Sequence, residues 1–311
     1  MPERVAWKKG IDLRDDKGYY SYRGRRYPSV TTVLGPHSDF VWVHCQWIAE
    51  KVVELVNKNY HGEEVERWDE VVDTLTGEKK WQLVPATAGE LLLDPQWLKN
   101  EGFRRLKQAA DRGSVIHDML ADYARGMEVV SCQLEDYLQE SIWEHKRTCK
   151  VDECLPYAKS LLAWLDKEQP TIYISESSVF NDDHEYAGTI DAVCGIGEEL
   201  YCLDIKTSDS FKRTWMAQIA AYSNALFGVI EDEGIQMEWP IPKETKCAIL
   251  QVLPDRYIWR PMEVHEVKAS FERLFLPSLN AYRANQSLPL PARGRTTKTG
   301  EKPVHLEVIS A

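Results

Sequence analysis

The chain has no long hydrophobic run. No segment approaches the roughly 18 consecutive apolar residues that a membrane-spanning helix requires. The first ten residues, MPERVAWKKG, lack the apolar centre of a secretory signal peptide. We therefore expect a soluble protein of the cytoplasm that has no membrane partner.

Cysteine pairs are also lacking. The seven cysteines are scattered along the chain, and no two of them form a CxxC pair. Structural zinc sites use closely spaced cysteines, and disulfide frameworks occur in secreted chains with an even number of them. The sequence therefore predicts reduced thiols and indicates neither zinc nor a disulfide framework.

Residues that favour disorder are scarce. The 15 prolines and 17 glycines accompany 11 tryptophans and 14 tyrosines, and 43% of the residues are hydrophobic. Disordered chains have few aromatic residues and little apolar surface to bury. A chain of 311 residues with this composition is expected to fold around a substantial core.

An excess of positive charge is missing as well, since the formal net charge is −11. Proteins that coat nucleic acid without sequence preference accumulate positive charge to hold phosphates. The charge is unevenly distributed, however. Residues 1–35 hold eight basic and four acidic residues, and residues 99–112 hold five basic and two acidic ones. Residues 61–78, by contrast, hold one basic and seven acidic residues. Positive surface therefore exists locally, although each patch alone is also consistent with solvated charge.

The first half of the chain is predicted to be largely helical. Apolar residues recur there at helical spacing, and Pro170 marks the end of this pattern. Alternating aromatics near the start indicate a hairpin, and the acidic stretch at 61–80 indicates an insertion. The predicted elements are a hairpin around Arg23-Gly24, a helix capped by Ser38, and helices at about 94–124, 131–147 and 153–168.

The second half is predicted to be α/β, with a central mixed β-sheet flanked by helices. We expect one composite domain over residues 1–290, made of a part at 1–168 and a core at 169–290. The basic tail at 291–311 is expected to be flexible. The predicted elements are strands at 171–180, 186–195, 199–206, 246–253 and 256–260, and helices at 213–228 and 263–284.

Two neighbouring strands carry acidic residues that we expect to converge. Alternation in the strand Leu-Asp-Ile-Lys turns Leu203 and Ile205 to one face and Asp204 and Lys206 to the other. A short turn with two glycines returns the preceding strand, which contains Asp191, beside Asp204. The hairpin would therefore bring two carboxylates and one ammonium group together.

This set of groups indicates a metal site with hydrolytic chemistry. Two carboxylates a few ångströms apart repel each other unless a cation lies between them, and oxygen ligands suit Mg²⁺ or Mn²⁺. Such an ion can activate water for phosphodiester hydrolysis, while Lys206 orients the water or offsets charge. A bare Asp-x-Lys is more often a simple ion pair, so the wider context of Asp204 decides between the two interpretations.

That context resembles the PD-(D/E)xK nuclease superfamily. Within it, the RecB-like exonuclease group is most similar, including Cas4-like, mitochondrial genome maintenance and phage-encoded exonucleases. The resemblance covers roughly residues 20–230 with gaps. The family pattern is a helical histidine, a glutamate, GxxD, DxKT and QxxxY, matched here in order by His117, Glu176, Gly188–Asp191, Asp204–Thr207 and Gln218–Tyr222.

The resemblance implies a restriction-endonuclease-like core and a role for each matched residue. Metal ligands would be Asp191, Asp204, the backbone carbonyl of Ile205, and His117. Lys206 would be the catalytic base or the group that orients water. Glu176 would support the metal shell, and Gln218 and Tyr222 would brace the site and approach the DNA backbone. Relatives with an iron–sulfur cluster have several cysteines after the last motif, whereas only Cys247 follows it here, so no cluster is expected.

Phosphate-binding groups are predicted around these motifs. Lys212 and Arg213 begin the helix of the QxxxY motif, where the helix dipole also favours anions. The helix of His117 carries three further candidates for DNA binding, Arg104, Arg105 and Arg112.

Some assignments remain open from sequence alone. His117 lies on an apolar stripe with Phe103, Leu106 and Leu120, where a buried structural histidine is the commoner case. Glu176 has nearby acidic rivals in Asp182, Asp183 and Glu185.

The expected function is a Mg²⁺- or Mn²⁺-dependent DNA exonuclease that acts on linear ends or single strands. Phage or bacterial recombination, repair or replication would be the setting, in the host cytoplasm for a phage protein, with a single-strand annealing protein as a candidate partner. An endonuclease of the same fold and a non-catalytic DNA-end-binding module are the alternatives. The tryptophan-rich residues 36–100 also allow a role in partner binding.

Overall fold

The computed structural model describes residues 8–37, 40–61, 64–72, 79–88, 91, 95–127, 133–232 and 234–288. A mixed sheet of eight strands forms its centre, in the order β10-β9-β1-β6-β7-β8-β11-β12. The mixed α/β class expected from the sequence is therefore confirmed. The sheet strands are β1 (Lys8–Gly10), β6 (Thr171–Asn181), β7 (Tyr186–Ile196), β8 (Glu199–Lys206), β9 (Phe227–Asp232), β10 (Ile235–Pro240), β11 (Lys246–Val252) and β12 (Tyr257–Met262).

Three strands in the middle of the sheet form an antiparallel meander. β6 pairs with β7 and β7 with β8, both antiparallel, and β8 continues into the sheet through a parallel pairing with β11. Strand β1, far away in sequence, pairs parallel with β6. This topology puts β7 and β8, which carry the acidic residues, in the interior of the sheet.

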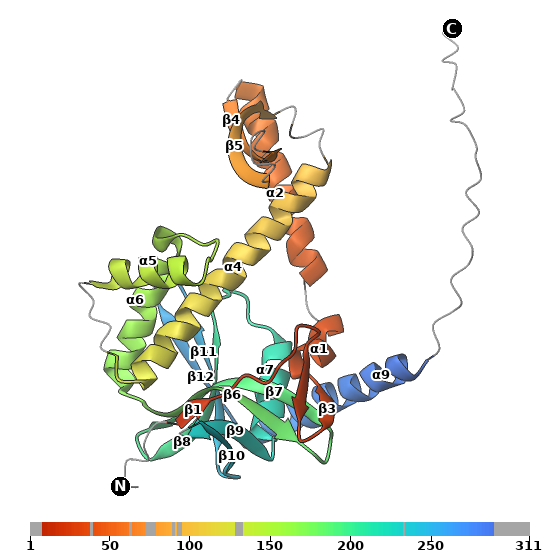
Figure 1. The fold of residues 1–311 in the computed structure, drawn as a ribbon, viewed down its shortest axis with the longest axis vertical. Helices are drawn as coiled ribbons and strands as arrows, with labels where there is room; N and C mark the ends of the chain where they lie inside the picture. Colours follow the sequence, from red (N-terminus) through yellow and green to blue (C-terminus); the bar gives the residue numbers. More distant parts are fainter. Residues whose placement is uncertain are drawn as a thin grey trace.

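Helices cover both faces of the sheet (Figure 1). The core on one face contains Val115, Leu161 and Trp164 with Leu203 and Ile205 of β8. The core on the other face contains Ile219 and Phe275, with Cys202 of β8. The helices of the first face are α4 (Pro95–Ala124), α5 (Leu134–Glu144) and α6 (Val151–Glu168), and those of the second are α1 (Val30–Leu34), α7 (Arg213–Ser223), α8 (Val264–Ser270) and α9 (Leu276–Ser287).

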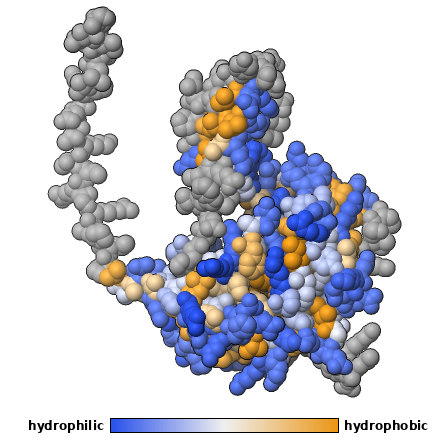
Figure 2. All heavy atoms as spheres, turned by 180° about the vertical axis from the view of Figure 1, so that it is seen from behind, coloured by the Kyte–Doolittle hydropathy of each residue, from blue (hydrophilic) through white to orange (hydrophobic). Residues whose placement is uncertain are grey.

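Part of the chain projects away from the sheet. Helix α2 (Phe40–His61), the hairpin of β4 (Glu64–Val72) and β5 (Lys79–Thr87), and the first turns of α4 form this projection (Figure 1). It has a small core of its own, in which Leu55, Val65, Ala88 and Leu91 are buried. Hydrophobic atoms also reach its surface (Figure 2). Val53 and Val56 of α2 and Phe103 of α4 are exposed large hydrophobic residues.

Most helices and strands agree with those predicted from the sequence, and a few differ. The hairpin around Arg23-Gly24 is formed by β2 (Tyr19–Tyr22) and β3 (Arg25–Pro28). Of the acidic stretch at 61–80, residues 64–72 and 79–80 lie in the β4–β5 hairpin. Phe103 was expected on the apolar stripe of its helix, but its side chain is 45% exposed. Ser38, Asp94 and the tail at 291–311 lie outside the described residues.

Two predicted helices are wrong in extent. The helix expected at 213–228 ends at Ser223, because β9 begins at Phe227 and pairs with β1, β6 and β10. The helix expected at 263–284 is divided by a π-helical turn at Phe271–Phe275. Strands β1, β9 and β10 were not predicted. Among the described helices, none combines the length and apolar character needed to cross a bilayer.

Candidate active site

The hairpin of β7 and β8 positions the two aspartates. Its ladder runs from the pair of Ile196 and Glu199 to the pair of Ala192 and Leu203, so Asp191 lies one step farther along β7. The backbone N–H of Ile205 donates a 2.6 Å hydrogen bond to Asp191 Oδ2. Asp191 is thereby held against the strand that carries Asp204, as the sequence predicts.

Asp204 and Lys206 share one face of β8. Lys206 Nζ lies 2.8 Å from Asp204 Oδ1 and 2.7 Å from Oδ2. Asp204 is fully buried, and Lys206 is its ionic partner, although the contact with Oδ2 does not have hydrogen-bond geometry. A buried carboxylate is costly unless it is paired and hydrogen-bonded. The pairing with Lys206 therefore offsets the cost of burying Asp204, and its oxygens can accept further ligands.

His117 reaches this site from α4. Its Nδ1 atom lies 3.3 Å from Glu176 Oε1 and 3.5 Å from Asp191 Oδ1. The helix lies against the DxKT segment, since a Cβ atom on Gly113, one turn earlier, would be in van der Waals contact with Thr207 Oγ1 at 3.5 Å. The helix and hairpin that carry the sequence motifs are thus in direct contact.

Glu176 belongs to the site, and its acidic rivals Asp182 and Glu185 have other partners. The pairs Ser175–Ala192 and Ser177–Ile190 place Glu176 opposite Asp191. Asp182 instead accepts a 2.6 Å hydrogen bond from Tyr27, and Glu185 forms an ion pair with Arg283 at 3.6 Å.

The backbone at Glu176 is unusual, and Gly10 accommodates it. Glu176 has a φ of 48°, in the left-handed region that residues with a Cβ atom rarely adopt. Strand β1 passes so close that a Cβ atom on Gly10 would lie 2.2 Å from the Ser175 carbonyl oxygen and 2.6 Å from that of Glu176. Gly10 is therefore a supporting residue that no sequence motif indicated.

The QxxxY motif braces the site from α7. Gln218 Nε2 donates a 2.9 Å hydrogen bond to the Tyr222 hydroxyl, so both side chains share one helix face as predicted. The Tyr222 ring packs on Gly188, where a Cβ atom would lie 2.3 Å from Tyr222 Cε1. The glycine of the GxxD motif is thus required by this contact.

The pKa values of the site reflect a concentration of negative charge in a buried place. Burial raises the pKa of Asp204 to about 6 and also raises that of Asp191, against the opposing effect of Lys206. Burial lowers the pKa of His117, but Asp191 and Glu176 outweigh it and raise the value to about 9. Burial likewise lowers the pKa of Lys206, and Asp204 and Asp191 outweigh it. The carboxylates therefore attract more positive charge than Lys206 supplies.

The donor set fits a divalent cation. One ligand atom from each of His117, Glu176 and Asp191 lies within 4.8 Å of the others, and the buried Asp204 carboxylate is close enough to interact electrostatically with Asp191 and His117. Carboxylate oxygens suit Mg²⁺ and Mn²⁺, and an imidazole nitrogen is compatible with Mn²⁺. Of the predicted ligands, His117 and Asp191 lie in this group, together with Glu176, which was expected to support the metal shell. Asp204 lies on the neighbouring strand beside Lys206, and Ile205 donates its N–H to Asp191.

The predicted DNA-binding cations differ in their surroundings. Arg104 donates two hydrogen bonds, of 2.7 and 2.6 Å, to Glu101, and Arg105 forms an ion pair with the same carboxylate at 3.5 Å. The Arg112 guanidinium lies 4.6 Å from the centre of the Tyr157 ring. Lys212 is the N-cap of α7, and Arg213, its first residue, is exposed. The positions of Lys212 and Arg213 agree with the sequence, while acidic side chains neutralise Arg104 and Arg105.

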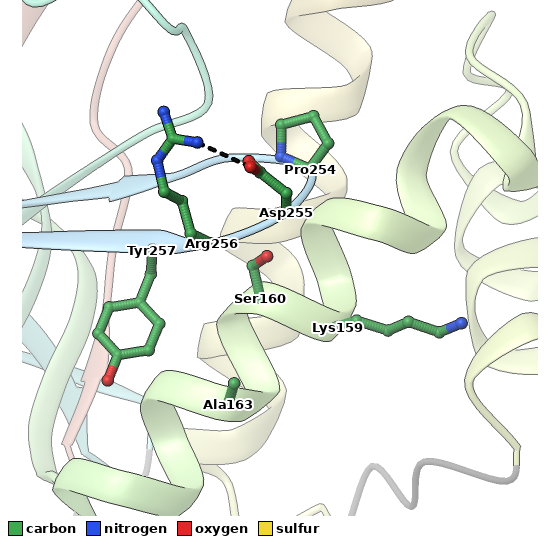
Figure 3. Close-up of a pocket in the computed structure, with 7 residues that line it drawn as sticks. All are labelled: Lys159, Ser160, Ala163, Pro254, Asp255, Arg256 and Tyr257. Atoms are coloured by element: carbon green, nitrogen blue, oxygen red, sulfur yellow. Dashed lines mark hydrogen bonds and ion pairs between the residues drawn. The ribbon is translucent and has the colours of Figure 1, made fainter.

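A separate pocket lies away from these groups. It has a volume of about 380 Å³ and lies between α6 and the turn that joins β11 to β12 (Figure 3). Its polar lining includes the ion pair of Asp255 and Arg256, while the Lys159 side chain points away from that pair. None of the motif residues lines it. The chemistry of this protein is therefore better sought at the carboxylate cluster.

Comparison with known proteins returned no match, either among protein-family models or among curated proteins.

Proposed function

We propose that this protein is a metal-dependent deoxyribonuclease with a restriction-endonuclease-like core, of the PD-(D/E)xK type that its motifs resemble. One observation supports this most strongly. Glu176 of β6 and Asp191 of β7 both contact His117, and Asp204 of the next strand, β8, pairs with Lys206. A structural ion pair requires only two of these groups, whereas metal-assisted hydrolysis of a phosphodiester uses all of them.

The residues divide the work according to their charge. The chemistry supplied by a bound Mg²⁺ or Mn²⁺ is polarisation of the phosphodiester and activation of water. Asp191 and Asp204, together with His117 and Glu176, would hold the ion. The raised pKa of Lys206 keeps its amine protonated at neutral pH. Lys206 therefore acts as a cation that orients water and offsets charge on the phosphate, rather than as the base.

The test is degradation of DNA by the purified protein in Mg²⁺ or Mn²⁺, with EDTA as a control. Linear DNA labelled at one end and covalently closed circles are compared. Lys206→Ala is expected to reduce the rate about 100-fold or more, as the loss of a charge-stabilising group does elsewhere. Lys246→Ala is the matched control, because Lys246 pairs with the exposed Glu199 at the other end of β8.

Each outcome has a distinct meaning. Metal-dependent loss of linear DNA alone, abolished by Lys206→Ala and retained in Lys246→Ala, would support the exonuclease that we propose. Cleavage of circles would indicate an endonuclease with the same site. DNA binding without cleavage in either metal would overturn the catalytic proposal.

A further inference from the structure

An exposed phenylalanine stands beside the candidate active site. Phe211 lies in the loop that joins β8 to α7 and is 41% exposed. The Arg260 guanidinium lies 4.9 Å from the centre of its ring, and the Trp215 ring meets it edge-on at 5.6 Å. Phe211 is therefore held between a cation and a second aromatic ring while part of its surface faces solvent.

The sheet register relates Phe211 to the carboxylates. Asp204 pairs with Ile249 of β11, and Ile249 pairs with Arg260 of β12. Residues paired across strands point to the same face, and neighbouring strands lie about 4.8 Å apart. Arg260 thus stands on the face of Asp204, roughly 10 Å across the sheet. Phe211 lies on this face because it contacts Arg260.

The loop that carries Phe211 is tied to the sheet. Gln251 Nε2 donates hydrogen bonds of 2.7 and 3.0 Å to the backbone carbonyls of Ser208 and Asp209. Gln251 is buried and pairs in register with Lys206. The loop is therefore anchored directly beside the catalytic lysine, and the ring is presented at a defined distance from it.

These groups have the chemistry of a single-strand binding site. Aromatic side chains stack on unpaired bases, and arginine adds both a cation–π contact and attraction for phosphate. A span of roughly 10 Å corresponds to about three nucleotide steps at the rise of 3.4 Å per step in B-form DNA, and to fewer in a stretched strand. A base inside a duplex has both faces covered by its neighbours and cannot reach the ring.

We propose that Phe211, supported by Arg260, stacks on one unpaired base of the DNA strand that enters the active site. This inference rests on the proposed nuclease function. It specifies the substrate as single-stranded DNA or as an unpaired end, and it makes Phe211 a residue that positions the strand relative to Asp204 and Lys206.

The test measures binding to a 5′-fluorescent 12-nucleotide oligothymidine by anisotropy in Mg²⁺, using Lys206→Ala protein so that the strand survives. Phe211→Ala is added to this background and is expected to weaken binding about 5- to 150-fold, the range for loss of one base–aromatic stack. Phe211→Trp is expected to retain affinity. Phe103→Ala is the matched control, because Phe103 is a similarly exposed phenylalanine, 45% exposed, on the projection.

A scan with a single abasic position then identifies the stacked base. With Phe211 present, one position of the 12-mer is expected to lose affinity when its base is removed. With Phe211→Ala, that position is expected to lose nothing further, because the two changes remove the same contact. Thermal melting of each variant establishes that the fold is retained.

The outcomes separate this inference from the proposed function. Suppose that the unmodified protein cleaves DNA in a metal-dependent way, but that the proteins with Phe211 and with Phe211→Ala have equal affinity and equal abasic profiles. This result overturns the stacking site alone. Base-specific binding through Phe211 without cleavage supports stacking and overturns the nuclease. Absence of binding to the oligothymidine overturns the stacking site, and the cleavage assay with the unmodified protein then decides the nuclease by itself.

Discussion

At the scale of single residues, the protonated His117 offsets part of the negative charge of the site in the metal-free protein. Its nitrogen lies between Glu176 and Asp191, and its pKa of about 9 means that it carries a proton at neutral pH when no metal is bound. The proton and a metal ion compete for the same carboxylates. Binding of the metal to the imidazole requires that the proton leave.

Metal affinity is therefore expected to depend on pH. Between pH 7 and about 9, the affinity for Mn²⁺ should rise by up to tenfold per pH unit, since one proton leaves His117 for each ion bound. Titration calorimetry at several pH values measures this slope. His117→Gln should bind more weakly and lose the slope, whereas His145→Gln, at the end of α5, should behave as the unmodified protein does. An unchanged slope in His117→Gln would remove His117 from the ligand set.

The raised pKa of His117 also makes the stability of the metal-free protein depend on pH. This stability falls as the pH rises, whereas metal affinity increases. A raised pKa in the folded state means that protonation of His117 stabilises the fold. This contribution is complete below about pH 6.5 and is lost as pH rises through about 9. Metal addition should therefore stabilise the protein most at alkaline pH.

At the scale of elements, the position of Glu176 depends on how closely β1 approaches β6. A methyl group on Gly10 would overlap the backbone of Ser175 and Glu176. Because these contacts are with backbone atoms, they cannot be relieved by a rotamer change. One strand or the other must move.

Gly10→Ala is expected to destabilise the protein by about 1–3 kcal/mol, the usual cost of overpacking, and to weaken Mn²⁺ binding through Glu176. Urea denaturation and calorimetry measure the two effects. Gly35→Ala is the control, because nothing lies within 4 Å of a Cβ atom there and its backbone is already helical. Unchanged stability and affinity in Gly10→Ala would show that β1 does not support the site.

The elements also explain what the sequence could reveal. Asp191, Asp204 and Lys206 lie in one local hairpin, so alternation and a short turn were sufficient to bring them together. The role of Gly10 depends on pairing with a strand more than 160 residues away, which no local pattern encodes. Glu176 was one of several acidic residues, and only the register with β7 distinguishes it. The helix predicted at 213–228 extended into the first two residues of β9, Phe227 and Gly228, because the pairing of β9 with β1 and β6 is not encoded locally.

At the scale of the whole molecule, helix α4 contributes to two separate hydrophobic cores, one in the projection and one against the sheet. Leu55 is buried in the core of the projection, and Leu161 is buried between α6 and the sheet. The candidate active site lies at the sheet, so the core against the sheet should stabilise the site more than the core of the projection does.

Leu55→Ala and Leu161→Ala are each expected to lower the free energy of unfolding of their own core by about 2–5 kcal/mol, as truncations of buried leucines do. Hydrogen exchange should show lost protection over α2 and β4–β5 for Leu55→Ala, with metal affinity unchanged. For Leu161→Ala the loss should extend across the sheet. Equal loss across the sheet in both variants would mean that the molecule unfolds as one unit.

Helix α4 is continuous for 30 residues, about 45 Å, from the projection to the carboxylates. Arg104 and His117 are 13 residues apart on it, roughly 20 Å along its axis. A tilt of about 3° over that length would displace His117 by about 1 Å, several times the 0.2 Å tolerance of a metal–ligand distance. A ligand that moved the projection and α4 together would therefore shift the imidazole relative to Glu176 and Asp191, and would change the affinity for the proposed ion.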